Sequence, residues 1–207
     1  MRNRRDLNRR ITCSTKQYRW LYVRVREIAT LFFCLVSMSC AIGGDPTPLP
    51  TATAVDLTRY TGLWHEVARL PMWAQRNCAT STAEYRLLDS GQVAVRNACV
   101  TKGGDRISID GEATVVDPDQ HAKLNVVFDQ WAAKLVAWLT SSEQGNYWIL
   151  RLDPGYQWAM VGTPDREYLW ILSRTPGLDE SLYGELVAYA HQLGFPTDRL
   201  IRAPLVP

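Results

Sequence analysis

The side chains that could carry out catalysis or hold a metal ion are few in this sequence, and they lie far apart. The three histidines, His65, His121 and His191, fall on different predicted elements. No serine lies in a nucleophile elbow, no His or Cys cluster has metal-ligand spacing, and no glycine-rich loop could cradle a phosphate. The sequence therefore predicts a protein that is not an enzyme and that uses no metal and no cofactor.

Cys40 is the cysteine whose surroundings point to covalent chemistry. A basic segment precedes the apolar run Ile28–Met38, and Cys40 follows after one small residue. Because this run is shorter than the roughly 20 residues that a membrane-spanning helix needs, residues 1–39 are predicted to be a signal peptide. SMSCAIGG (37–44) resembles a bacterial lipoprotein cleavage box, although Ser37 stands where leucine is usual. Lipidation of Cys40 is the favoured hypothesis, and simple secretion is the alternative.

The segments on either side of this box have their own expected roles. Residues 1–22 make the basic region unusually long, which suggests that the natural start lies further along, near Val23 or Val25. After Cys40, Gly, Pro and Thr dominate and no apolar periodicity is present, which indicates a flexible linker over 40–54. The folded domain is expected to occupy residues 55–207.

The distribution of charge argues against a nucleic acid partner. The formal net charge is +2, but residues 1–44 hold nine Lys and Arg against Asp6 and Glu27. The remainder therefore carries 14 basic and 19 acidic residues. A domain with this acidic balance lacks the basic surface that nucleic acid binding requires.

Cys78 and Cys99 are the two cysteines that remain in the predicted domain, since Cys13 and Cys34 belong to the leader. A two-residue turn at Ser90–Gly91 would bring them close to opposite each other across a hairpin, provided that the pair contains a bulge or a wider start. In an exported protein a disulfide between them is favoured over two free thiols.

Eight short runs with strand-like alternation follow one another after residue 55. Turn residues such as Asp89-Ser90-Gly91 and Asp153-Pro154-Gly155 separate them. Short strands at hairpin-like spacing predict an all-β fold, an antiparallel sandwich or barrel built as a meander. The runs cover residues 62–70, 79–88, 92–101, 106–116, 121–129, 146–152, 157–162 and 167–174.

One amphipathic helix is predicted close to the C-terminus. Its apolar residues recur at helical spacing, namely Leu178, Leu182, Leu186, Ala190 and Leu193. Asp179 can cap the first turn, Gly194 can take the left-handed position after the last turn, and Pro196 prevents continuation. We expect this helix to pack outside the sheet, because the strand 168–174 is apolar on both faces.

Three segments of the sequence resemble the signature regions of the lipocalins. They are GLW (62–64), YQWAMVG (156–162) and YLWILSRTP (168–176), and the similarity runs from about residue 55 to residue 203. Gly-x-Trp alone is a weak signal, but three regions in order and followed by one helix are specific. Together with Cys40 they make the chain most similar to the bacterial outer-membrane lipocalins, which also resemble apolipoprotein D.

The resemblance implies an all-β fold, an eight-stranded antiparallel up-and-down lipocalin barrel with one C-terminal α-helix packed outside. In lipocalins the signature Trp lies at the closed end of the barrel under the signature Arg, and these roles fall here to Trp64 and Arg174. A guanidinium over an indole ring is a cation–π contact worth roughly 0.5 to 2 kcal/mol. Gly62 would let the preceding segment cross the barrel floor without a side chain in the way.

The lumen of such a barrel holds either its own side chains or one small ligand. Alternation along the strands and the resemblance select seven candidate ligand-binding residues, Trp148, Tyr85, Glu66, Leu124, Val126, Phe128 and Leu150. Ordinary core packing is the alternative for each, and Trp148 is the strongest candidate because the corresponding Trp of the resembling apolipoprotein lies in the pocket. Glu66 must be paired or protonated, with Tyr85 as a candidate partner. No inward Lys or Arg is expected apart from Arg174.

The resemblance also implies a function. We expect a binding protein that stores or transports a fatty acid or a lysophospholipid in its lumen. It is expected to be lipid-anchored through Cys40 to the cell outer membrane, with the domain facing the periplasm. A homodimer is also considered. An envelope lipoprotein with a filled barrel and a structural role is the second hypothesis, and a lipid-modifying lipocalin enzyme is a weaker third. Residues 129–146 are longer than a hairpin link requires, and a membrane-contacting helix, a lid and continued strands are all compatible with them.

The lipidation hypothesis predicts that Cys40→Ala releases the protein from the membrane fraction, because the variant lacks the thiol that accepts the lipid. Fractionation of cells expressing each form, followed by immunoblotting, measures this. A variant that still sediments with membranes after a high-salt wash would show that another feature attaches the protein.

Overall fold

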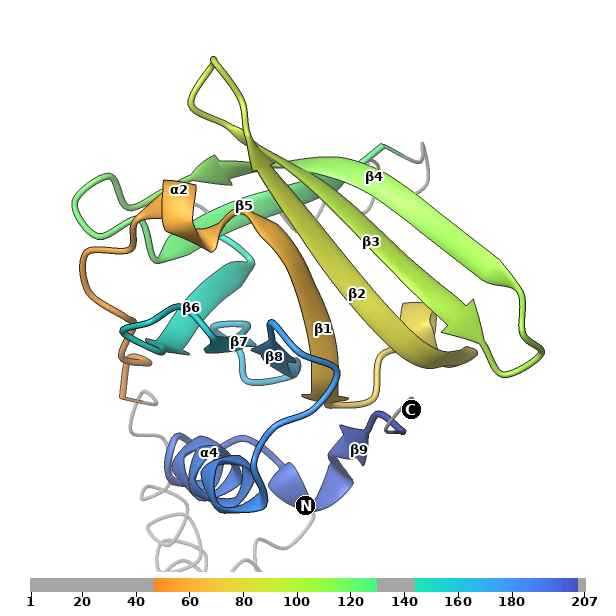
Figure 1. Ribbon diagram of the computed structural model, residues 1–207. Coiled ribbons are helices and arrows are strands. Elements are labelled where there is room, and N and C mark those ends of the chain that lie inside the picture. The colour runs from red at the N-terminus through yellow and green to blue at the C-terminus, as the bar shows by residue number, and fades with distance from the viewer. Residues whose placement is uncertain (1–46, 130–143, 205–207) are drawn as a thin grey trace, which may run out of the picture. The chain divides into compact units, whose positions relative to one another are not determined.

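Eight antiparallel strands close into a barrel in the computed structural model, which describes residues 47–129 and 144–204 (Figure 1). Each strand pairs with the next along the chain, and β1 pairs with both β8 and β2, which completes the ring. All eight predicted strands are confirmed, with ends that differ by a few residues. They are β1 (Gly62–Arg69), β2 (Cys78–Leu87), β3 (Val93–Thr101), β4 (Arg106–Val115), β5 (Lys123–Phe128), β6 (Tyr147–Leu152), β7 (Trp158–Gly162) and β8 (Leu169–Ser173).

The predicted helix is α4 (Glu180–Gln192), and its ends are those that the sequence indicates. The Asp179 carboxylate accepts hydrogen bonds from the backbone N–H groups of Ser181 and Leu182. Gly194 follows the helix with φ +87°, a conformation that glycine adopts without strain. No helix in the described part of the chain is long and apolar enough to cross a membrane.

Short elements complete the domain. The helical turn α2 (Leu57–Tyr60) precedes β1, and the 3₁₀ turn η1 (Trp73–Gln75) joins β1 to β2. A second 3₁₀ turn, η2 (Thr197–Arg199), leads from α4 into the two-residue strand β9 (Ile201–Arg202), which pairs with the end of β1. The sequence does not predict β9, because two residues carry no periodicity.

The helix α4 covers the outer face of the barrel. Leu186 and Ala190 are fully buried and belong to an apolar cluster with Met160 of β7 and with Leu169 and Ile171 of β8. The opposite face of β8 contributes Leu172 to the cluster inside the barrel. Strand β8 is therefore apolar on both faces because one face lines the lumen and the other lies under the helix.

The end of the barrel at which β1 begins is closed by Arg174. Its guanidinium lies 3.8 Å from the centre of the Trp64 indole ring, and Trp64 is fully buried. It also donates hydrogen bonds of 2.9 Å to three backbone carbonyls, those of Arg59, Thr61 and Leu63. Gly62 has φ +92°, and a Cβ at this position would lie 3.4 Å from the guanidinium. Arg174 thus seals the floor with one planar group that satisfies several carbonyls at once.

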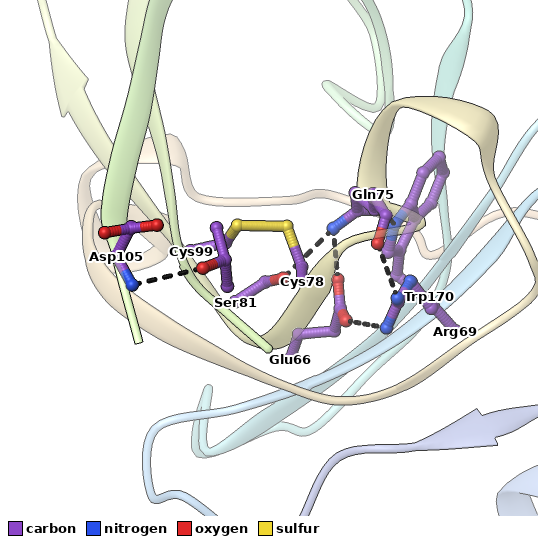
Figure 2. The surroundings of a disulfide bond; sticks show 9 residues. Glu66, Arg69, Gln75, Cys78, Ser81, Cys99, Asp105 and Trp170 are labelled. Atoms are coloured by element: carbon purple, nitrogen blue, oxygen red, sulfur yellow. Dashed lines mark hydrogen bonds and ion pairs between the residues drawn. A yellow bond between two sulfur atoms is a disulfide. The ribbon is translucent and has the colours of Figure 1, made fainter. Parts of the chain in front are cut away.

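Cys78 and Cys99 form the predicted disulfide between β2 and β3, with their Cα atoms 5.7 Å apart (Figure 2). The pairing register shifts between Cys78 and Thr80, so the bulge that the sequence argument required is present. Because β2 runs from Cys78 towards the strand positions beside Gly62, the disulfide lies at the end of the barrel away from Arg174. This end is called the mouth below.

The chain already packs against the barrel before residue 55. Leu49 is buried, and the backbone N–H of Ala52 donates to the Ile149 carbonyl at 2.8 Å. The compact unit begins at Pro48. The expected flexible linker therefore does not extend to residue 54, because Leu49 joins the cluster under α4. The predicted signal peptide, Cys40 and most of the segment 129–146 lie outside the described residues.

Arg174→Lys should lower the free energy of unfolding by about 2 kcal/mol, because one ammonium cannot reach carbonyls spread around a planar guanidinium. Urea denaturation followed by circular dichroism measures the change. The matched control is Arg86→Lys, since Arg86 is exposed and makes no side-chain hydrogen bond or ion pair with the described residues. Equal stability of the two variants would show that Arg174 does not hold the floor closed.

Candidate functional site

The lumen is lined by apolar side chains from all parts of the ring. Tyr85 and Leu124 are buried in this cluster, and Val126 and Phe128 pack against it. A cavity of about 10 Å³ lies deep in the lumen, among Leu57, Tyr60, Tyr85, Val93, Ala113, Leu124, Val126 and Tyr147. Four of the seven candidate ligand-binding residues therefore face the lumen, namely Tyr85, Leu124, Val126 and Phe128.

Trp148 and Leu150 lie on the other side of the barrel wall, so their assignment to the lumen was wrong. Both belong to the apolar cluster under α4, while Ile149 belongs to the lumen cluster. A Cβ at Gly162 would meet both Leu150 and Phe195, which shows how closely this side is packed. The reason for the error is physical: β6 is apolar on both faces, so its alternation does not indicate which face is inward.

Three tyrosines bring hydroxyl groups into the apolar lumen. Tyr147 forms hydrogen bonds with Tyr60 at 2.8 Å and with Tyr85 at 2.9 Å. Burial raises the pKa of Tyr60 and Tyr147 well above the ordinary value and that of Tyr85 to about 12. We call these residues the tyrosine triad, and at neutral pH its members are uncharged phenols.

A β-bulge in β1 places two charged residues on the same face of the strand. Glu66 and Arg69 are three positions apart, so regular alternation would direct them to opposite faces. The pairing register with β8 shifts between Glu66 and Ala68. As a result Val67 and Ala68 both join the cluster under α4, and Arg69 turns to the same side as Glu66. Ala68, which regular alternation from Glu66 would direct into the lumen, is therefore outside it.

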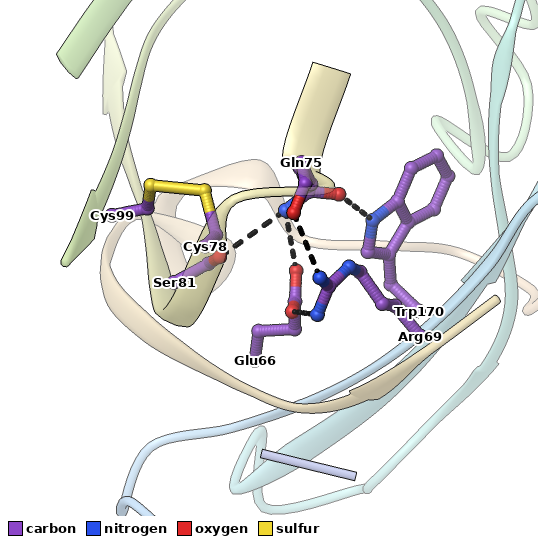
Figure 3. A network of polar contacts seen from close by, with 7 residues as sticks. All are labelled: Glu66, Arg69, Gln75, Cys78, Ser81, Cys99 and Trp170. Atoms are coloured by element: carbon purple, nitrogen blue, oxygen red, sulfur yellow. Dashed lines mark hydrogen bonds and ion pairs between the residues drawn. A yellow bond between two sulfur atoms is a disulfide. The ribbon is translucent and has the colours of Figure 1, made fainter. Parts of the chain in front are cut away.

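Glu66 and Arg69 form the centre of a buried polar network at the mouth (Figure 3). Arg69 donates 2.9 Å hydrogen bonds to the Glu66 carboxylate and to the backbone carbonyl of Gln75. The Gln75 amide donates to Glu66 at 2.7 Å and to Ser81 at 3.2 Å, and it accepts from the Trp170 indole at 3.2 Å. The mouth network therefore joins η1 to β1, β2 and β8 beside the disulfide.

The mouth network corrects two expectations about polar groups in the lumen. Glu66 pairs with Arg69 and Gln75, whereas Tyr85 bonds to Tyr147 instead. Arg69 is only 3% exposed, so Arg174 is not the only guanidinium on the inner side of the barrel. The Nε atom of Arg69 is buried and has no hydrogen-bond partner among the described residues. A second guanidinium lies on the inner side of the barrel because the bulge in β1 turns Arg69 inward.

Burial raises the pKa of the Glu66 carboxyl above its ordinary value of 4.5. Arg69 and Gln75 oppose this effect, because they stabilise the charged form. The effect of burial is the larger, so protonation of Glu66 is easier in the folded protein than in the unfolded chain.

The described residues do not form a metal site. Within 47–129 and 144–204, no three or more His, Cys, Asp or Glu side chains are grouped so that they could hold an ion. The charged groups at the mouth are an ion pair joined by one 2.9 Å contact, and their other hydrogen bonds go to Gln75. The geometry is thus that of an apolar cavity with hydroxyl groups inside and an ion pair at one end.

Comparison with known proteins agrees with this architecture. Residues 55–205 match the family model described as a lipocalin-like domain. The chain belongs to the lipocalin family. The resemblance seen in the three sequence segments is therefore confirmed, and Gly62, Trp64 and Arg174 occupy the positions that it implies.

Relatives extend the lipocalin assignment over most of the chain. Temperature-induced lipocalin-1 of Arabidopsis thaliana is 37% identical over 152 residues, which cover 72% of this chain and 79% of that protein. Outer membrane lipoprotein Blc of Escherichia coli (strain K12) is 33% identical over 177 residues, or 84% and 91% of the two chains. The structure of insecticyanin from the tobacco hornworm Manduca sexta aligns with a TM-score of 0.56 and 20% identity, covering 80% and 88%, and it supports the fold alone.

Sequence reasoning missed Arg69, Gln75 and Tyr147 as residues of the lumen. No local signal marks a bulge inside HEVAR (65–69), and the contacts of Gln75 depend on where η1 lies after folding. Tyr147 could have been found only by choosing the other face of β6. The hydrogen-bond partners of Tyr85 and Glu66 therefore came from the tertiary structure.

The raised pKa of Glu66 predicts a pH-dependent contribution to stability. This stabilising contribution is fully present at pH values below 4.5, the ordinary pKa of the carboxyl group. It is lost as the pH rises through the higher pKa that Glu66 has in the folded protein. Glu66→Gln has no proton to lose at this position. The free energy of unfolding of the wild type minus that of the variant should therefore increase as the pH falls from about 7 to about 4. Denaturant titrations at several pH values measure it, and a difference that stays constant would contradict the raised pKa.

Proposed function

We propose that this lipocalin binds hydrophobic small molecules in its lumen, with fatty acids and lysophospholipids as the ligand class. The observation that supports this is the apolar inner face around the tyrosine triad, in a barrel whose floor Arg174 closes. A ligand would enter from the mouth, and each buried methylene would contribute roughly 0.8 kcal/mol before the costs of association. Tyr85, Leu124, Val126 and Phe128 are the proposed contacts.

We further propose that the protein is attached to the outer membrane through a lipidated Cys40, with the domain facing the periplasm. The name of the Escherichia coli relative, an outer membrane lipoprotein, supports this location. The cysteine box at 37–44 supports the mode of attachment. Binding rather than catalysis is the proposed activity, and a lipid that leaves the protein chemically changed would contradict it.

A second function is favoured by one observation. The cavity among the eight residues named above has a volume of only about 10 Å³, which is room for about one water-sized group. A barrel filled by its own side chains would suit a structural or interaction lipoprotein of the envelope. Under this second proposal the barrel takes up no acyl ligand, whereas under the first the lumen side chains rearrange around one.

The first proposal predicts that affinity increases with acyl length until the lumen is full, by up to roughly fourfold for each methylene. A fatty acid and a lysophospholipid of equal chain length should compete for one site. Isothermal titration with a chain-length series measures both effects. Absence of saturable binding for every chain length would favour the filled barrel.

Two substitutions on β5 locate the site. Val126 packs against the lumen cluster, whereas Val127 is on the opposite face of the same strand. Val126→Trp should weaken binding of long chains at least roughly tenfold, because the indole takes up lumen volume. Val127→Trp is the matched control and should bind as the wild type does, with the Tm of both variants recorded. Equal losses in both variants would place the ligand outside the lumen.

A further inference from the structure

The tyrosine triad joins three distant parts of the chain inside the barrel. Tyr60 comes from α2, Tyr85 from β2 and Tyr147 from β6. Tyr60 and Tyr85 are 4% and 6% exposed, and Tyr147 is half-buried. The ring centres of Tyr60 and Tyr85 lie 5.4 Å apart. Tyr147 meets Tyr85 edge-on at 6.1 Å. The rings are packed as a core, but their hydroxyl groups meet at one point in apolar surroundings.

Counting protons shows that the triad cannot satisfy itself. Three hydroxyl groups carry three donor protons, and the two hydrogen bonds that join them use two. The hydroxyl groups make no other hydrogen bond with the described residues, so one proton is left over in every arrangement of donors and acceptors. A buried donor without a partner is unfavourable. The triad therefore offers one O–H for which the described residues supply no acceptor.

The space beside the triad matches a small acceptor. The cavity of about 10 Å³ is lined by all three tyrosines, and its other walls are apolar, formed by Leu57, Val93, Ala113, Leu124 and Val126. This volume holds about one water-sized group. A chain methyl group in the same place would leave the O–H unpaired, whereas an oxygen atom would accept its proton.

The chemistry of the walls also limits the charge of the acceptor. The triad is uncharged at neutral pH, because the ordinary pKa of a phenol is about 10. Burial raises the pKa of each of the three further. The guanidinium of Arg174, which acts on Tyr60, is already bound to three backbone carbonyls. A carboxylate placed here would therefore exchange its hydration for a single hydrogen bond, which is unfavourable. An uncharged carbonyl or hydroxyl oxygen loses far less hydration and makes the same bond.

We infer that the tyrosine triad is a recognition site for an uncharged oxygen acceptor at the inner end of the lumen ligand. Within the proposed ligand class, the preferred lipids are then those whose apolar chain ends in a carbonyl or hydroxyl group near the barrel floor, over those whose chain ends only in methyl. This inference rests on the proposed function, because it concerns a molecule bound in the lumen. It adds selectivity for the end of the chain that lies opposite the head group.

The test compares two acids that share a head group and differ at the inner end, hexadecanoic acid and 15-oxohexadecanoic acid. Affinities for the full chain are measured for the wild type and for the triple variant Tyr60→Phe, Tyr85→Phe, Tyr147→Phe. All three hydroxyls must be removed, because any one that remains keeps a free proton. The preference for the oxo acid should fall about tenfold in the triple variant, as expected for one hydrogen bond.

Tyr189→Phe is the matched control, because Tyr189 lies on α4 against the outer cluster. This variant should keep the preference of the wild type. If both acids bind and their affinity ratio is the same in the wild type and the triple variant, the inference is overturned while the proposed function stands. If neither acid binds to the wild type, the proposed function fails and the inference fails with it.

A spectroscopic measurement on the wild type does not depend on the folding of the triple variant. The ketone of the oxo acid is labelled with carbon-13, and its infrared carbonyl stretch is recorded in the bound state. A hydrogen bond from a phenol should lower the frequency relative to the same ketone in hexane. A bound carbonyl at the hexane frequency would overturn the inference.

Discussion

The contact between Arg174 and Trp64 is the interaction on which the rest of the barrel depends. A closed ring of strands has two open ends, and water that entered at both would leave no apolar interior. The guanidinium covers the indole at 3.8 Å and binds carbonyls of β1 and of the segment that leads into it. One end is thereby sealed without a buried unpaired charge, since the carbonyls supply the acceptors that a guanidinium needs. The lumen between this sealed end and the mouth can then be lined by apolar side chains.

The bulge in β1 determines the chemistry of the opposite end. Without it, Arg69 would face away from Glu66, and each would be a lone charge. With it, the two form a buried pair that also holds Gln75 and the turn η1 in place. The disulfide beside this network fastens β2 to β3 at the same end. The mouth is thus ordered by polar bonds and a covalent link, whereas the floor is ordered by one planar cation.

Polar groups in the lumen are arranged by depth. The tyrosine triad lies deep, where it adjoins the floor through the Tyr60–Trp64 ring contact at 5.0 Å, and the ion pair lies at the mouth. Apolar side chains line the same lumen, with Ala83, Val95 and Phe128 among the residues of the cluster. A molecule that is apolar in its middle and bears oxygen at its inner end complements this order, because each part meets surroundings of its own polarity.

The sequence by itself determined the fold, because each of its signals is local. Strand alternation, turn residues, the capped helix and the segment containing Trp64 all act within a few positions, and the eight strands, α4 and the disulfide are confirmed. Only the tertiary structure decided which face of β6 is inward. Both faces of this strand are buried and apolar, so the sequence pattern does not distinguish the inward face from the outward one. It alone also decided the partners of Glu66 and Tyr85. Those partners depend on a bulge and on contacts between α2, η1, β2 and β6, and such contacts exist only once the ring has closed.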